Sequence, residues 1–136
     1  MTVDIMRILP AAILFSVTSA PAFGMDCADQ TQLGLDKCAN ASFQRADHAL
    51  NNAYREVVRR LGGDEYKKRL LAAAETAWIA VRDAECKFAV SSTEGGSIYP
   101  MEYSLCLEGE TQKRTKDLQA YLHCEEGDLS CPVPVQ

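Results

Sequence analysis

The cysteines constrain the fold of this chain more than any other feature of its 136 residues. All six follow an N-terminal segment that resembles an export signal. An even number of cysteines in an exported chain predicts disulfides, although six cysteines allow fifteen pairings. Their spacing along the chain favours local pairs, each closing a short loop: Cys27–Cys38, Cys86–Cys106 and Cys124–Cys131. Loops of this size each stabilise a fold by about 3 kcal/mol in the chain-entropy model.

Residues 1–24 have the pattern of a secretory signal peptide, with Arg7 in a short polar start and small residues up to Gly24. The apolar run between them is shorter than the roughly 20 residues that span a bilayer. Asp26, directly before Cys27, does not suit lipid attachment. We therefore expect a periplasmic or secreted protein, with no stable membrane insertion after signal cleavage.

Helical periodicity dominates the rest of the chain, and no segment alternates as a half-buried strand does. Apolar residues recur at steps of three and four between Cys38 and Leu61, which predicts a first helix. A second helix follows Asp64, a suitable N-cap, and a third runs from about Met101 to Leu122. We expect the second helix to bury these residues: Tyr66, Leu70, Ala73, Ala74, Ala77, Trp78, Val81 and Phe88.

Short connections between successive helices predict antiparallel packing. The predicted fold class is therefore all-α, a small antiparallel bundle of about three helices stapled by disulfides. It occupies residues 25–123, and residues 124–136 form an acidic, proline-containing tail with a disulfide loop. In one straight helix, Cys27 and Cys38 would lie about 16 Å apart, beyond bridging range. Their pairing therefore requires a bend, which we place at Gly34.

The sequence offers little support for catalysis or a cofactor. It has no Cys-x-x-Cys, and His48 and His123 are far apart, so we expect no metal site. Ser97 lacks the Gly-x-Ser-x-Gly pattern of a nucleophile elbow. Asp83 and Glu85 are too close on one helix to flank a sugar ring. We predict that the protein is not an enzyme.

The charge of the chain argues against nucleic acid as a partner. The net charge is −5, and acidic residues interrupt the one basic cluster, between residues 55 and 69. Asp47 falls close to the apolar face of the first helix, beside Tyr54. An unpaired carboxylate there is costly, so we expect Asp47 to pair with Arg82 or Arg114. Trp78 shares a helix face with Arg82 and is expected in the core.

Several of these residues form a pattern that resembles the LprI-like family of exported bacterial lysozyme inhibitors. The matching residues span positions 27–122 in order and spacing: Cys27, Cys38, Asp47-x-x-Leu50-Asn51-x-x-Tyr54, Trp78-x-x-x-Arg82-Asp83-x-x-Cys86, Gly95-Gly96-Ser97, Cys106, Thr111-x-x-Arg114 and Leu118. The resemblance implies a helical domain with bridges 27–38 and 86–106. It also implies an inhibitor of lysozyme, and the acidic charge suits a strongly cationic c-type enzyme. The alternative function is a structural or adaptor module of the cell envelope that binds another protein without inhibiting it.

The segment Ser97-Ile98-Tyr99 is the predicted inhibitory loop. Lysozyme inhibitors of unrelated families insert a short loop with Ser and Tyr into the catalytic cleft, and this segment offers that chemistry. Gly95 and Gly96 let the backbone turn, while Pro100 restricts Tyr99 to extended conformations. The alternative is a plain interhelical turn, in which Ser97 caps the third helix and Tyr99 packs on it.

Overall fold

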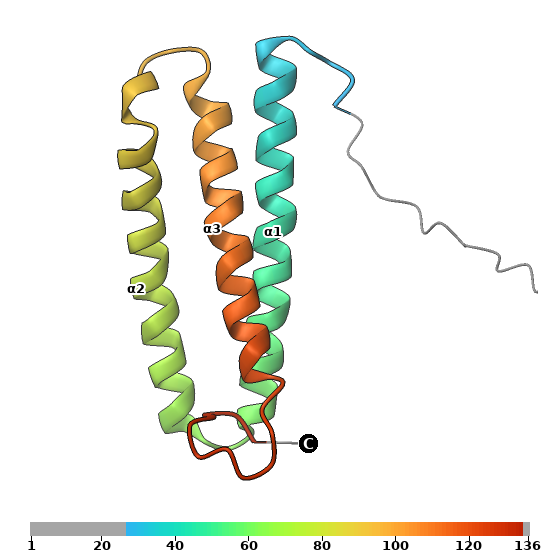
Figure 1. Cartoon of the computed structure of the whole chain (residues 1–136), viewed down its shortest axis with the longest axis vertical. Coiled ribbons are helices and arrows are strands. Elements are labelled where there is room, and N and C mark those ends of the chain that lie inside the picture. Colours follow the sequence, from blue (N-terminus) through green and yellow to red (C-terminus); the bar gives the residue numbers. More distant parts are fainter. Residues whose placement is uncertain (1–26, 135–136) are drawn as a thin grey trace, which may run out of the picture.

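The computed structural model describes residues 27–134, and they form three long helices with no strand among them (Figure 1). Helix α1 spans Gln32–Leu61, α2 spans Glu65–Ala89 and α3 spans Tyr99–Tyr121, with a 3-10 turn, η1, at Ser91–Thr93. Successive helices run antiparallel, which confirms the predicted fold class. The predicted signal peptide, residues 1–24, lies outside the described residues. None of the described helices is long and apolar enough to cross a bilayer.

The first helix begins earlier than the sequence indicated. Thr31 is its N-cap, and its hydroxyl oxygen accepts a hydrogen bond from the Gly34 backbone N–H at 3.1 Å. The prediction of a bend at Gly34 is therefore wrong, because Gly34 lies inside the first turn and the chain reverses before Thr31. A side chain at Gly34 would collide with Asp29, so the glycine allows the preceding segment to fold back. This reversal brings Cys27 to Cys38.

The core lies mainly between α1 and α3, which pack side by side along most of their length (Figure 1). Leu118 of α3 is completely buried among apolar residues of α1. The cluster also includes Val133 from the tail, and its buried members are Leu50, Ala53, Val57, Leu61, Leu118 and Val133. Regular steps of three and four residues along α1 place its four members on one face.

Helix α2 packs on this pair through an unexpected face. Its buried residues are Glu75, Arg82 and Cys86, while Leu71 and Trp78 are partly buried against the core. The prediction that the second helix buries its apolar residues is wrong for most of them. Tyr66, Leu70, Ala73, Ala74, Ala77, Val81 and Phe88 are all exposed. The polar groups instead face α1 and α3 because they find partners there.

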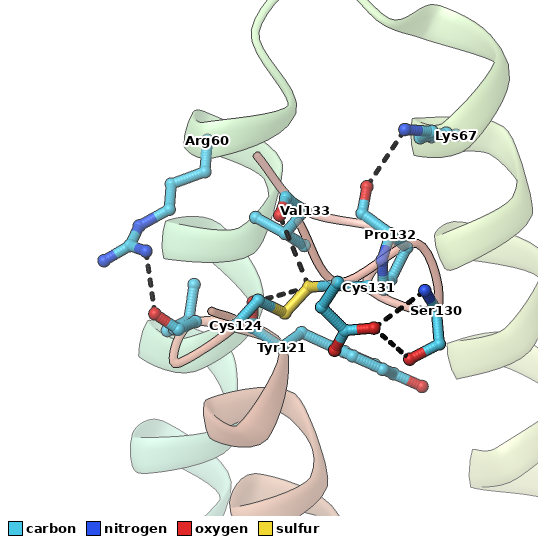
Figure 2. The surroundings of a disulfide bond; sticks show 10 residues. Arg60, Lys67, Tyr121, Cys124, Ser130, Cys131, Pro132 and Val133 are labelled. Atoms are coloured by element: carbon cyan, nitrogen blue, oxygen red, sulfur yellow. Dashed lines mark hydrogen bonds between the residues drawn. A yellow bond between two sulfur atoms is a disulfide. The ribbon is translucent and has the colours of Figure 1, made fainter. Parts of the chain in front are cut away.

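All three disulfides have the predicted local pairing, with Cα–Cα distances of 5.9 Å for Cys27–Cys38, 5.6 Å for Cys86–Cys106 and 5.9 Å for Cys124–Cys131. The third forms the loop of the tail at the base of the bundle (Figure 2). Arg60 of α1 donates to the Leu122 carbonyl at 2.8 Å, and Lys67 of α2 donates to the Pro132 carbonyl at 3.1 Å. Arg60 thus ties the end of α3 to α1, while the tail is held to α2 by Lys67 and to α1 by the packing of Val133.

Candidate functional site

The connection between α2 and α3, residues 90–98, lies at the end of the bundle opposite the tail (Figure 1). The disulfide Cys86–Cys106 lies beneath it and ties the last turn of α2 to α3. Cys86 is completely buried, so this anchor belongs to the packed interior. A short connection fixed in this way loses little conformational entropy when it binds a partner.

Local contacts within the connection define its shape further. Gly95 has φ +80°, a conformation that residues with a side chain rarely adopt. The Gly96 N–H donates to the Thr93 carbonyl at 2.9 Å, and a Cβ on Gly96 would press against that oxygen. The Thr93 hydroxyl lies 2.7 Å from the Glu102 carboxylate of α3. The backbone conformation thus favours glycine at position 95, and position 96 leaves little room for a side chain.

The three residues of the predicted loop differ in their surroundings. Ser97 is exposed, and among the described residues its side chain makes no hydrogen bond, so it does not cap α3. Ile98, the N-cap residue, is 38% exposed. Tyr99 begins α3 and is partly buried. Ser97 and Ile98 therefore point to solvent as a pair.

Tyr99 packs on its own helix, as the alternative of a plain turn required. Its ring stacks on Tyr103 one turn later, with centroids 5.9 Å apart and planes within 4°. Burial raises the pKa of the Tyr103 phenol, and the nearby Asp83 carboxylate raises it further. The raised pKa keeps the Tyr103 phenol protonated, so this ring of the stack carries no charge.

A second group of motif residues lies deeper, where α2 meets α1 and α3. The Arg82 guanidinium lies 5.4 Å from the ring centre of Phe43 on α1 and 5.2 Å from that of Trp78. It also contacts the Asp83 carboxylate at 2.8 Å and donates to the buried Thr111 hydroxyl of α3 at 3.3 Å. Arg82 thus contacts all three helices while only 9% of it is exposed.

The second motif arginine has a different acidic partner from the one expected. Arg114 of α3 donates two hydrogen bonds to the Glu75 carboxylate of α2, one of them at 2.8 Å. Asp47 instead accepts a hydrogen bond from Asn51 at 3.0 Å. In the part of the chain described, it pairs with neither Arg82 nor Arg114, so that prediction is wrong. Both arginines are satisfied by acids of α2 that lie closer to them.

Glu75 is the important residue that reasoning from sequence missed. It lies seven residues before Arg82, two helical turns away, and therefore shares the inward face of α2 with it. That spacing was the available signal. Tyr54 and Trp78 are both partly buried and pack against the core cluster. The geometry gives Tyr54, Trp78 and Glu75 positions between helices, whereas residues 95–98 of the connection are all exposed.

An apolar cavity of about 200 Å³ lies at the end of the bundle away from the α2–α3 connection, where the tail covers the ends of α1 and α2. Val57, Leu61, Leu71, Tyr121 and Val133 are among its lining residues. Lys67 and Arg114 lie at its margin, but Asp64 and Glu75 already pair with them. The cavity is part of the junction between tail and bundle.

Comparison with known proteins decides the family. The family model described as lysozyme inhibitor LprI matches residues 25–118. The chain belongs to the LprI family. The match covers all three helices up to Leu118 and ends before the tail, so the tail disulfide lies outside the region that the family shares.

Relatives of this LprI-family chain occur in several bacteria. It is 35% identical to uncharacterized protein R02472 of Rhizobium meliloti over 133 residues, covering 86% of this chain and 96% of that protein. It is 29% identical to uncharacterized protein YecT of Escherichia coli over 112 residues, covering 72% and 69%. A crystal structure of a DUF1311 family protein from Pseudomonas putida is similar in fold, with a TM-score of 0.61 and 27% identity over 68% of this chain and 91% of that one.

The LprI family is one of inhibitors rather than catalysts, and it implies a lysozyme-binding protein in general terms. Family and disulfides together indicate an extracytoplasmic protein, because disulfides persist in oxidising compartments.

Proposed function

We propose that this LprI-family protein is exported through its N-terminal signal, acts in the periplasm or outside the cell, and inhibits lysozyme of the c type. The observation that carries the proposal is the family match over residues 25–118. Blocking the enzyme would protect peptidoglycan from hydrolysis. The protein itself supplies no catalytic group in this account and acts by occupying the cleft.

Residues 95–99, the end of the connection and the first residue of α3, are the proposed contact with the enzyme. The Ser97 hydroxyl makes no hydrogen bond to any residue between positions 27 and 134, which suits donation to a catalytic carboxylate. Ile98 offers an apolar side chain, and the stacked Tyr99 and Tyr103 rings form a flat surface next to it. An uncharged loop can enter a carboxylate-lined cleft without repulsion. Meanwhile the net charge of −5 attracts a cationic enzyme over longer range.

A lysis assay with the purified mature protein tests this function against c-, g- and i-type lysozymes. We expect inhibition of the c-type enzyme and a weakening of roughly tenfold for Ser97→Ala, because one charge-assisted hydrogen bond is lost. Tyr99→Phe keeps the ring stack and removes only the hydroxyl, so it separates hydrogen bonding from stacking. Ser92→Ala is the matched control, since Ser92 is an exposed serine in the neighbouring turn η1.

Two results contradict the proposal at different levels. Full inhibition by the folded Ser97→Ala, Tyr99→Phe double variant would exclude the loop but leave the function intact. The exposed acidic residues Glu125 and Glu126 of the tail would then be the next site to test. No inhibition of any of the three enzyme types would favour the envelope adaptor instead.

A further inference from the structure

The solvent side of α2 carries an apolar stripe along the whole helix. Its members recur at steps of four and three residues, so they lie on one face. They are Tyr66, Leu70, Ala73, Ala77, Val81, Ala84 and Phe88, here called the α2 outer stripe. Tyr66 is 64% exposed and Phe88 79%, and the smaller members between them are exposed as well.

The amphipathicity of α2 is therefore reversed within the monomer. A surface helix normally turns its apolar face to the core and its charged face to water. In α2 the inward face holds the charged residues Glu75 and Arg82, both 9% exposed. Ala77 follows Glu75 by two residues, about 200° around the helix, so the middle of the stripe points away from α1 and α3. Leu70, near one end, also lines the cavity beneath the tail. Figure 1 shows α2 at the side of the α1–α3 pair, and no other helix among residues 27–134 lies over its outer surface.

We propose that the α2 outer stripe is a self-association face. On it, a second copy of this chain packs its own α2 in antiparallel orientation, about a two-fold axis at Ala77. Three observations favour a second copy over another partner: the pairing of side-chain sizes, the charges on one flank of the stripe, and the area available.

The side chains are complementary in size under this symmetry. Positions equally far from Ala77 face each other across the axis. Leu70 then meets the partner's Ala84, and Val81 meets the partner's Ala73, so each large aliphatic residue faces a small one. Tyr66 meets the partner's Phe88, which pairs the two aromatic rings at each end. At the axis Ala77 faces the partner's Ala77, where two helices can approach closely.

Charges beside the stripe are complementary as well. Lys67 and Glu85 are separated by five helical turns and therefore lie on the same flank. In an antiparallel pair the same flanks meet, which places Lys67 beside the partner's Glu85 and repeats the contact by symmetry. The opposite flank carries charges of both signs, Arg69, Asp83 and Lys87, so it does not oppose the pairing.

The exposed area is large enough for a specific dimer. An aromatic side chain buries about 150–250 Å² when fully enclosed, and Tyr66 and Phe88 leave most of theirs exposed. With the aliphatic members, the stripe offers on the order of 500 Å² per chain, at the upper end of apolar patches on monomers. Two copies together would bury about 1,000 Å², the lower bound for a biological interface.

Sedimentation velocity of the mature protein over a wide concentration range tests the proposal. We expect a monomer–dimer equilibrium that Ala77→Glu weakens by roughly a hundredfold, because it opposes two carboxylates at the axis. Ala72→Glu is the matched control: Ala72 is also an exposed alanine of α2, but it lies well outside the stripe. Both variants should keep the helical circular dichroism and melting temperature of the monomer.

A charge exchange tests the antiparallel register separately. Glu85→Lys alone should weaken the dimer, since it places a lysine beside the partner's Lys67. Adding Lys67→Glu should restore it, because each changed residue again meets an opposite charge.

Several outcomes would overturn the proposal. One is a protein that stays monomeric at all concentrations. Another is a dimer whose dissociation constant does not change on Ala77→Glu, or rises as much on Ala72→Glu as on Ala77→Glu. A monomer whose inhibition of lysozyme is lost on Ala77→Glu would assign the stripe to the enzyme instead. Failure of the double charge exchange to restore association would exclude the antiparallel register.

Discussion

Charged side chains at the junction of the helices hold α2 in place. Arg82 lies between two aromatic rings and also contacts an acid and a hydroxyl, and such cation–π contacts are strengthened by burial. Arg114 and Glu75 form a second, more enclosed pair, with 15% and 12% of their side chains exposed. A buried ion pair of this kind determines position more than it adds stability.

We predict that breaking the Glu75–Arg114 pair from one side is costly and that removing both charges is not. Glu75→Met leaves Arg114 with only the exposed Asp117 carboxylate, 3.9 Å away, and should reduce the free energy of unfolding by about 3 kcal/mol. Arg114→Met should cost a similar amount. The double variant replaces both by apolar groups of similar volume and should lie within about 1 kcal/mol of the parent. Urea unfolding of the four proteins provides the cycle, and additive losses would contradict this account.

At the level of elements, the two ends of the bundle are built differently. The proposed inhibitory loop rests on the Cys86–Cys106 bridge inside the region that the family model matches, whereas the Cys124–Cys131 bridge holds a tail outside it. Each bridge is local, so each acts on its own end. This separation allows the role of the loop to be tested by removing one bridge at a time.

Replacing Cys86 and Cys106 together by alanine should destabilise the protein by about 3 kcal/mol. It should also weaken the inhibition of lysozyme by the molecules that remain folded. The reason is that the loop loses its anchor and must be ordered on binding. The matched control is replacement of Cys124 and Cys131, which should lower stability while inhibition by the folded protein stays unchanged. Melting curves and the lysis assay provide the two measurements, and equal loss of inhibition in both variants would contradict the prediction.

On the scale of the whole molecule, the tail completes the core that α1 and α3 leave open at their ends. Val133 is only 3% exposed and joins the cluster around Val57, while Leu129 in the same loop is fully exposed. The dimer inferred above would place the two loops at opposite ends of the assembly, where each can bind an enzyme.

Val133→Ala should therefore reduce the free energy of unfolding by about 1.5 kcal/mol, since it removes two buried methyl groups. Leu129→Ala removes a larger side chain from the same loop, yet should change stability by less than about 0.5 kcal/mol. Chemical denaturation of both variants measures the difference. Equal effects would mean that the tail does not pack on the bundle in solution.

The sequence by itself determined the helices, their antiparallel order and the disulfide pairs. These features depend on local periodicity, on glycine pairs such as Gly62-Gly63, and on cysteines close together along the chain. The turn at the proposed inhibitory loop also followed from local signals, because Gly95 adopts a positive φ that residues with a side chain rarely adopt.

Only the tertiary structure decided which face of α2 is buried. Two stripes with helical spacing run along that helix, one apolar and one containing Glu75 and Arg82, and periodicity alone favours burying the apolar one. The charged stripe is buried because Arg114, Thr111 and Phe43 satisfy it, and these partners lie on other helices. Asp47 was assigned the wrong partner for the same reason. Pairing between distant segments depends on the three-dimensional distance between their side chains. Spacing along one helix gives no information about that distance.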